Sequence, residues 1–168
     1  MSQELDIIRR VKAEHEVLRG HVKLVGDSIS DREAAHSLQG AHTEWIPGRL
    51  ELVAEKQKAL QRTLAGLEEG LARHFSFEER VLPPLLGELL ARALAMEHRE
   101  IAAEIGGAIS MAASMTTEGL GREEAMAQDA RIQQAVDGIG HLVGEHAARE
   151  EALLDMLERA LEGGARPI

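Results

Sequence analysis

The sequence predicts an all-α protein, an antiparallel up-down four-helix bundle built by a single domain over residues 1–168. Two observations lead to this fold class. Apolar residues recur at alternating spacings of three and four, which is typical of a helix with one face turned toward a core. Runs that alternate β-branched or aromatic residues with polar ones, which indicate strands, are nearly absent, and the chain has no Tyr and only two Phe. A chain of 168 residues is also long enough for one domain with a substantial core.

Four segments carry such an apolar stripe. The Ser-, Asp- and Gly-rich stretch 27–47 is expected to form the only long connection, with room for a short helical turn. Pro83-Pro84 separates the second stripe from the third, because proline clashes with the preceding helical turn and cannot donate to it. Residues 116–119 separate the third stripe from the fourth. The expected helices cover about residues 3–29, 48–81, 85–115 and 122–162.

Composition excludes several classes of protein. The 29 Asp and Glu residues outnumber the 19 Lys and Arg residues, and a net charge of −10 would repel nucleic acid and anionic membranes. The absence of cysteine excludes disulfide frameworks, thiolate zinc sites and iron–sulfur clusters. No apolar run approaches the roughly 20 residues that span a bilayer, and the first residues lack signal-peptide features. We therefore expect a cytoplasmic protein with no nucleic-acid partner and no membrane partner.

Six polar residues stand where the helical pattern calls for core residues. A buried carboxylate without a partner is strongly destabilising, and no Lys or Arg lies on the same stripes to neutralise it. A metal ion would supply the missing positive charge, and histidine with carboxylate on facing helices is how bundle cores hold di-iron centres. The six predicted metal ligands are His15, His74, Glu78, His98, His146 and Glu150.

The spacing of these residues strengthens the metal hypothesis. His74 and Glu78 are four residues apart, as are His146 and Glu150, so each pair lies on one face of its helix. A lone core histidine is more often a packing residue, and a single pair at this spacing is common on surfaces. Two pairs on separate buried stripes, with a histidine on each remaining stripe, favour a metal site over coincidence. Imidazole with carboxylate suits iron, manganese or zinc.

These positions resemble the hemerythrin-like (HHE cation-binding) family over nearly the whole chain. The segments that carry the resemblance are the first-helix His15, the run 74–83 (HFSFEERVLP), the segment 97–101 (EHREI) and the segment 145–151 (EHAAREE). The resemblance implies a four-helix bundle with two non-haem iron ions and an oxo or hydroxo bridge, with manganese or zinc as replacements in recombinant protein. It also implies a small diatomic or peroxide ligand, and a monomer or homodimer.

Two departures from the oxygen-carrying hemerythrins affect the expected function. Those proteins have a second histidine one turn after the third-helix ligand, where this chain has Ala102, and an aspartate five residues after the fourth-helix histidine, whereas Glu150 lies four residues after His146. Two six-coordinate irons offer about twelve positions, of which the predicted ligands and one bridge take about ten. About two positions would stay open, unless Glu97 fills one in place of solvent; the alternative is that Glu97 is an exposed helix residue.

Several functions agree with this count. The leading interpretation is a di-iron protein that binds dioxygen or a related small oxidant for storage, sensing or detoxification. Open positions equally suit an enzyme that reduces peroxide or nitric oxide. A metal-dependent regulatory module and a metal-free structural bundle are further alternatives.

A few neighbouring residues complete the predictions. Glu79 and Glu151 each follow a predicted ligand, and either accept a hydrogen bond from a ligand imidazole or contribute only surface charge. Phe75 and Phe77 are expected to pack beside the site, and Trp45 to cap one end of the bundle. The remaining histidines are given no role, and His141 in particular is expected to face solvent; they are His21, His36, His42 and His141.

Overall fold

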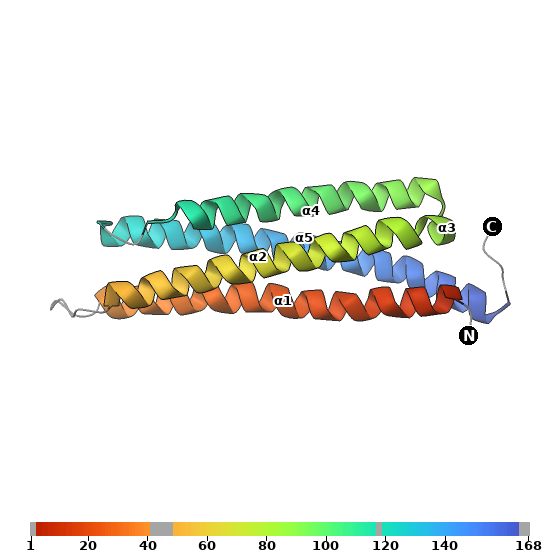
Figure 1. Ribbon diagram of the computed structural model, residues 1–168, viewed down its shortest axis with the longest axis horizontal. Helices are drawn as coiled ribbons and strands as arrows, with labels where there is room; N and C mark the ends of the chain where they lie inside the picture. The colour runs from red at the N-terminus through yellow and green to blue at the C-terminus, as the bar shows by residue number, and fades with distance from the viewer. Residues whose placement is uncertain (1–2, 41–48, 117–118, 165–168) are drawn as a thin grey trace.

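The computed structural model describes residues 3–40, 49–116 and 119–164. The four long helices lie side by side and run alternately up and down, as Figure 1 shows. Each long helix packs against two neighbours: α1 contacts α2 and α5, and α4 contacts the same two helices. The predicted all-α bundle is confirmed. Its helices are α1 (Gln3–Gly40), α2 (Arg49–Val81), α3 (Pro83–Leu86), α4 (Glu88–Ser114) and α5 (Arg122–Glu162).

The first helix is longer than predicted. It continues past Ile29 to Gly40, so the expected long connection is helical over much of its length. The core face simply continues at the same spacing through Arg32 and Ala35, both of which are buried. Arg32 looks like a loop or surface residue in the sequence, but Asp129 of α5 forms an ion pair with it inside the bundle. Trp45 lies outside the described residues.

Two prolines and a glycine form the corner between α2 and α4. Pro83 and Pro84 occupy the first positions of the one-turn helix α3, where the missing amide hydrogen costs no hydrogen bond. Gly87 follows with φ of 77°, in the left-handed region that favours glycine, and α4 begins at the next residue. The predicted third helix is therefore divided at Gly87, and the prolines end α2 as expected.

The bundle core consists of two separate hydrophobic clusters. On each long helix, the predicted metal ligands lie between residues of the larger cluster and residues of the smaller one. On α1, for example, Val11 belongs to the smaller cluster, Leu18 to the larger, and His15 lies between them. The smaller cluster consists of Ile8, Val11, Phe77, Leu82, Leu94 and Leu154. A polar layer thus crosses the bundle from side to side, closed off by apolar packing at both ends.

Candidate metal centre

The six predicted ligands meet in this polar layer, and none of their residues is more than 3% exposed. Each long helix contributes at least one of them, because the stripe that faces the core is interrupted at the same level on all four helices. The contributions are His15 from α1, His74 and Glu78 from α2, His98 from α4, and His146 and Glu150 from α5.

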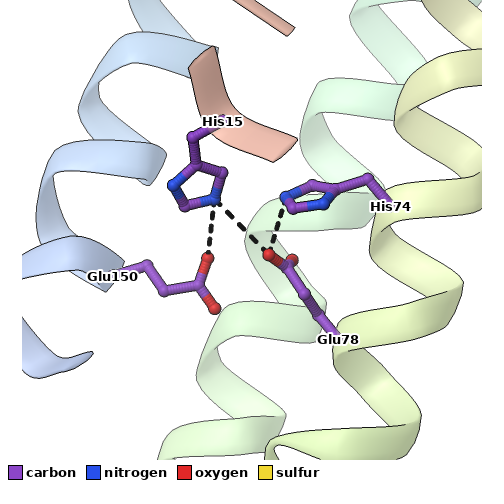
Figure 2. Close-up of side chains that lie close together, drawn as sticks. All are labelled: His15, His74, Glu78 and Glu150. Carbon is purple, nitrogen blue, oxygen red and sulfur yellow. Dashed lines mark ion pairs between the residues drawn. The ribbon is translucent and has the colours of Figure 1, made fainter. Parts of the chain in front are cut away.

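The first group of donors joins α1, α2 and α5. One ligand atom from each of His15, His74, Glu78 and Glu150 lies within 4.8 Å of the others. Figure 2 shows both imidazoles directed toward the two carboxylates. The Nε2 atom of His15 lies 3.4 Å from Glu78 Oε1 and 3.2 Å from Glu150 Oε2, and that of His74 lies 2.6 Å from Glu78 Oε1.

The second group of donors joins α2, α4 and α5. It contains Glu78, His98 and His146, again with ligand atoms within 4.8 Å of one another. The second oxygen of Glu78 lies 3.2 Å from His98 Nε2. Glu150 Oε2 is farther from His146 Nε2, at 3.7 Å. Glu78 therefore belongs to both groups, whereas Glu150 belongs to the first and reaches only His146 of the second.

The atoms at the centre of the layer have the polarity that a cation requires. Four Nε2 atoms and all four oxygens of Glu78 and Glu150 are buried and form no hydrogen bond. The outer nitrogen Nδ1 of each histidine faces a carboxylate, which can only accept, so Nδ1 carries a hydrogen, and in the neutral imidazole Nε2 then presents a lone pair. Lone pairs that face carboxylate oxygens at these distances repel unless a cation lies between them. The residues present therefore fit a bound metal.

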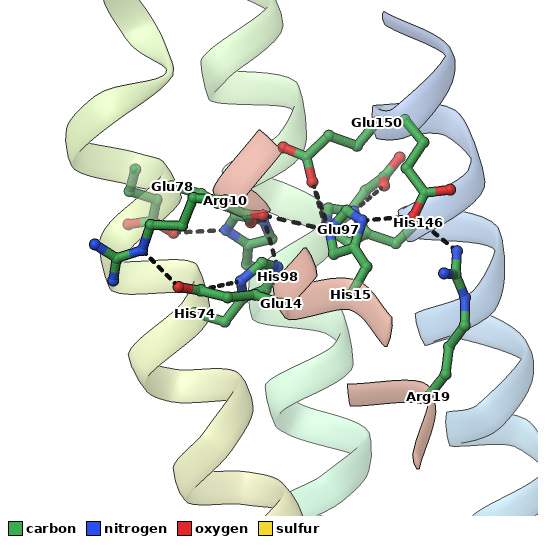
Figure 3. A network of polar contacts seen from close by, with 12 residues as sticks. Arg10, Glu14, His15, Arg19, His74, Glu78, Glu97, His98, His146 and Glu150 are labelled. Atoms are coloured by element: carbon green, nitrogen blue, oxygen red, sulfur yellow. Dashed lines mark hydrogen bonds and ion pairs between the residues drawn. The ribbon is translucent and has the colours of Figure 1, made fainter. Parts of the chain in front are cut away.

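The outer nitrogens bind four further glutamates, which we call the outer glutamates: Glu14, Glu79, Glu97 and Glu151. The distances from Nδ1 to carboxylate oxygen are 2.9 Å for His15 with Glu151, 2.9 Å for His74 with Glu14, 3.0 Å for His98 with Glu79 and 2.8 Å for His146 with Glu97. Such partners fix the ring orientation and tautomer of a ligating histidine. Figure 3 shows this network, with Glu14 between Arg10 and His74.

Sequence reasoning found two of the four outer glutamates. Glu79 and Glu151 are hydrogen-bond acceptors, not plain surface charge. Glu97 is neither a surface residue nor a filler of the open position, because its carboxylate binds the outer nitrogen of His146. Glu14 was missed altogether. The signal was present, since each outer glutamate directly precedes or follows a predicted ligand in the chain.

Without a metal, protons compensate the charges of the layer. Burial lowers the pKa of His15, but its contacts with Glu150 and Glu78 outweigh burial and raise that pKa to about 10. Burial raises the pKa of Glu78, yet the imidazoles of His15, His74 and His98 bring it well below its usual range. For Glu150, burial together with the neighbouring Glu78 carboxylate raises the pKa despite the contact with His15. Metal and protons therefore compete for the same atoms.

The aromatic residues pack beside the layer as expected. The ring of Phe75 stacks on His98 with centroids 4.0 Å apart and lies 5.8 Å from the ring of His146. Phe77 belongs to the smaller hydrophobic cluster, where the Arg10 guanidinium covers its ring at 3.9 Å. His141 faces solvent with 72% of its side chain exposed.

A family model described as the hemerythrin HHE cation-binding domain matches residues 6–157. The chain belongs to the hemerythrin family. Searches of curated proteins and of solved structures found no match. The matched range contains all six predicted ligands and the four outer glutamates, so the family assignment and the buried His and Glu groups agree on a cation-binding helical domain. Within the described part of the chain, no helix combines the length and apolar character needed to cross a membrane.

Proposed function

We propose that this hemerythrin-family protein binds two iron ions in the polar layer and uses them to bind dioxygen or a related small oxidant. The observation that carries the proposal is the convergence of eight buried donor atoms that form no hydrogen bond. The two overlapping donor groups support two ions, and the shared Glu78 supports a carboxylate bridge between them. Imidazole and carboxylate oxygen are ligands that suit iron. Storage, sensing or detoxification of the oxidant are the roles that this chemistry serves.

The two donor groups differ in a way that bears on reactivity. The first offers four donor residues and the second three. An ion held by fewer protein donors keeps more positions for an external ligand. Ala102, where oxygen carriers have a further histidine, is exposed and brings no donor to the second group. We infer that His98 and His146 hold the ion with the larger open share of its coordination sphere.

The smaller number of donors in the second group also favours a second candidate function, the reduction of peroxide or nitric oxide. The residues of the layer would hold a reduced iron pair, which would pass electrons to a substrate in the open positions, and turnover would need an external electron donor to reduce the pair again. The protein's own contribution is an apolar ring beside the donors, since Phe75 stacks on His98. An apolar neighbour suits small molecules that need no polar recognition.

Metal analysis and optical spectra test the leading proposal. Protein purified in air from iron-supplemented cells is expected to contain about two irons per chain and to show the near-ultraviolet bands of an oxo-bridged ferric pair. His146→Ala should lose iron, whereas the matched control His141→Ala, an exposed histidine on the same helix, should keep it. Wild-type protein without bound metal, and with unchanged stability in chelator, would refute the proposal.

Reaction with ligands separates the two candidates. After anaerobic reduction, a spectrum that changes with dioxygen and returns when dioxygen is removed supports carriage or sensing. Catalytic consumption of peroxide or nitric oxide, at a rate that depends on His98, supports the enzyme.

A further inference from the structure

The outer glutamates connect the four long helices in a closed cycle. Each accepts a hydrogen bond from a histidine on an adjacent helix, never from its own. Glu14 of α1 binds His74 of α2, and Glu79 of α2 binds His98 of α4. The cycle continues from α4 to α5 through Glu97 and His146, and returns to α1 through Glu151 and His15. The order follows the packing of the helices, so every contacting pair of long helices shares one such bond.

Three of the four outer glutamates are held by an arginine as well. Arg10 donates to Glu14 at 2.8 Å, and Arg19 donates to Glu151 at 2.8 Å. Arg149 lies 3.2 Å from Glu97. These arginines fix their carboxylates from the solvent side, while the histidine nitrogens fix them from the core side.

Glu79 differs from the other three. Within the described residues, its one ion-pair contact is with His98, and no arginine or lysine pairs with it. Its side chain is 48% exposed, against 31% for Glu14, 31% for Glu97 and 28% for Glu151. One hydrogen bond near the surface, between His98 Nδ1 and Glu79, therefore holds the outer side of the His98 ring.

We propose that Glu79 is the positioning residue that controls metal exchange, and that the metal enters and leaves through the α2–α4 face beside His98. This inference rests on the proposed metal binding. Rotation of the Glu79 side chain away from His98 breaks one hydrogen bond. Rotation of any other outer glutamate away from its histidine also breaks an ion pair with arginine. Once Glu79 turns away, the His98 ring keeps its stacking on Phe75 but loses the hydrogen bond that fixes its rotation and tautomer.

The number of inner donors also makes the α2–α4 face the place where a metal ion is held least firmly. His98 belongs to the donor group with three members, so its departure leaves only Glu78 and His146 on that ion. The first group would keep three donors after losing any one. The charge at Glu79 also suits entry, because no arginine or lysine of the described residues pairs with this carboxylate, and it attracts an approaching metal ion.

Zinc-loaded protein allows the exchange to be measured apart from any activity, because zinc binds the same ligand types and has no redox chemistry. Zinc release into excess chelator is expected in two phases, one for each ion. Glu79→Ala should accelerate the faster phase by about 10-fold or more, the usual effect of losing such a partner. Glu79→Gln keeps an oxygen acceptor and should restore much of the wild-type rate. Glu68→Ala, an exposed glutamate on the same helix, is the matched control and should change nothing.

A second measurement needs no substitution. In the zinc-loaded protein, the imidazole Nδ1–H protons that bind carboxylates can be followed by NMR. The His98 proton should exchange with solvent faster than those of His15, His74 and His146. Arg149→Gln removes the arginine that pairs with Glu97. In this variant the exchange rate of the His146 proton should rise toward that of the His98 proton.

The outcomes distinguish this inference from the proposed function. If wild-type protein binds two zinc ions but Glu79→Ala releases them at the wild-type rate, or the His98 proton is the best protected of the four, the inference is refuted and the metal site stands. If wild-type protein binds no zinc and no iron, both proposals fail together.

Discussion

Glu78 is the residue whose loss should affect the centre most. It is the one donor shared by both groups, with one oxygen 2.6 Å from His74 Nε2 and the other 3.2 Å from His98 Nε2. Glu78→Ala reduces the first group from four donors to three and the second from three to two. Losing even an indirect partner of a metal ligand lowers affinity by about 10- to 100-fold. Losing a direct donor should therefore cost more than about 100-fold at both ions, or about 3 kcal/mol each.

The comparison with Glu150 makes this prediction specific. Glu150→Ala removes a donor from the first group and only the 3.7 Å contact with His146 from the second, so it should lower metal content less than Glu78→Ala does. Glu78→Gln preserves the side-chain volume and removes the charge, and should resemble the alanine variant. Glu68→Ala serves as the exposed control on α2.

Metal content is measured by mass spectrometry after gel filtration, with circular dichroism to confirm that each variant keeps its helices. We expect about two metals per chain in the wild type, fewer in Glu150→Ala and the fewest in Glu78→Ala. Retention of two metals by Glu78→Ala would refute the bridging role. A folded Glu150→Ala that loses more metal than Glu78→Ala would refute the unequal division of the donors.

Five other predictions concern pH and stability. In metal-free protein the pKa of His15 is raised from 6.5 to about 10, so its contacts stabilise the fold fully below pH 6.5 and lose this effect as the pH rises toward 10. Thermal unfolding should show this fall in metal-free wild type and not in His15→Gln. For the same reason, metal uptake near pH 8 should release at least one proton, measurable with an indicator dye, and an uptake without proton release would contradict the assignment of His15. Acidification below about pH 5 should release the metal, because ligating imidazoles must be neutral, and a protein that keeps its metal at about pH 4 would not be using histidine ligands. Leu60 is fully buried in the larger cluster, so Leu60→Ala should lower the free energy of unfolding by about 2–5 kcal/mol and leave metal content intact. Gln57 donates to the carbonyl oxygens of Ala112 and Met115 at the end of α4, so Gln57→Ala should cost about 1–3 kcal/mol in chemical denaturation.

Much of the fold could be predicted from the sequence because helical periodicity is a property of one segment at a time. Each stripe of apolar residues indicates which face of its helix is buried, and this prediction does not depend on which helices are its neighbours. Polar residues on that face are exceptions that need a partner, which is why His74 and Glu78 were recognisable as candidate ligands. The structure buries all six candidates in one layer.

Contacts between helices could not be predicted in the same way. The burial of Arg32 on α1 depends on its ion pair with Asp129 of α5. The sequence does not show this partner, and the extension of α1 past Ile29 was missed for that reason. Glu97 was assigned to the surface or to the open position, while its actual partner is His146 on another helix.

The sequence by itself therefore determined the class of fold, the faces of the helices and the six polar residues that the structure buries together in one layer. Only the tertiary structure decided which glutamate binds which histidine, that three of the outer glutamates are held by arginine, and that Glu78 lies in both donor groups. The physical reason is that these contacts depend on which helices are neighbours, how far each is shifted along the bundle axis and how each is rotated. A pattern within a single helix carries none of those three quantities.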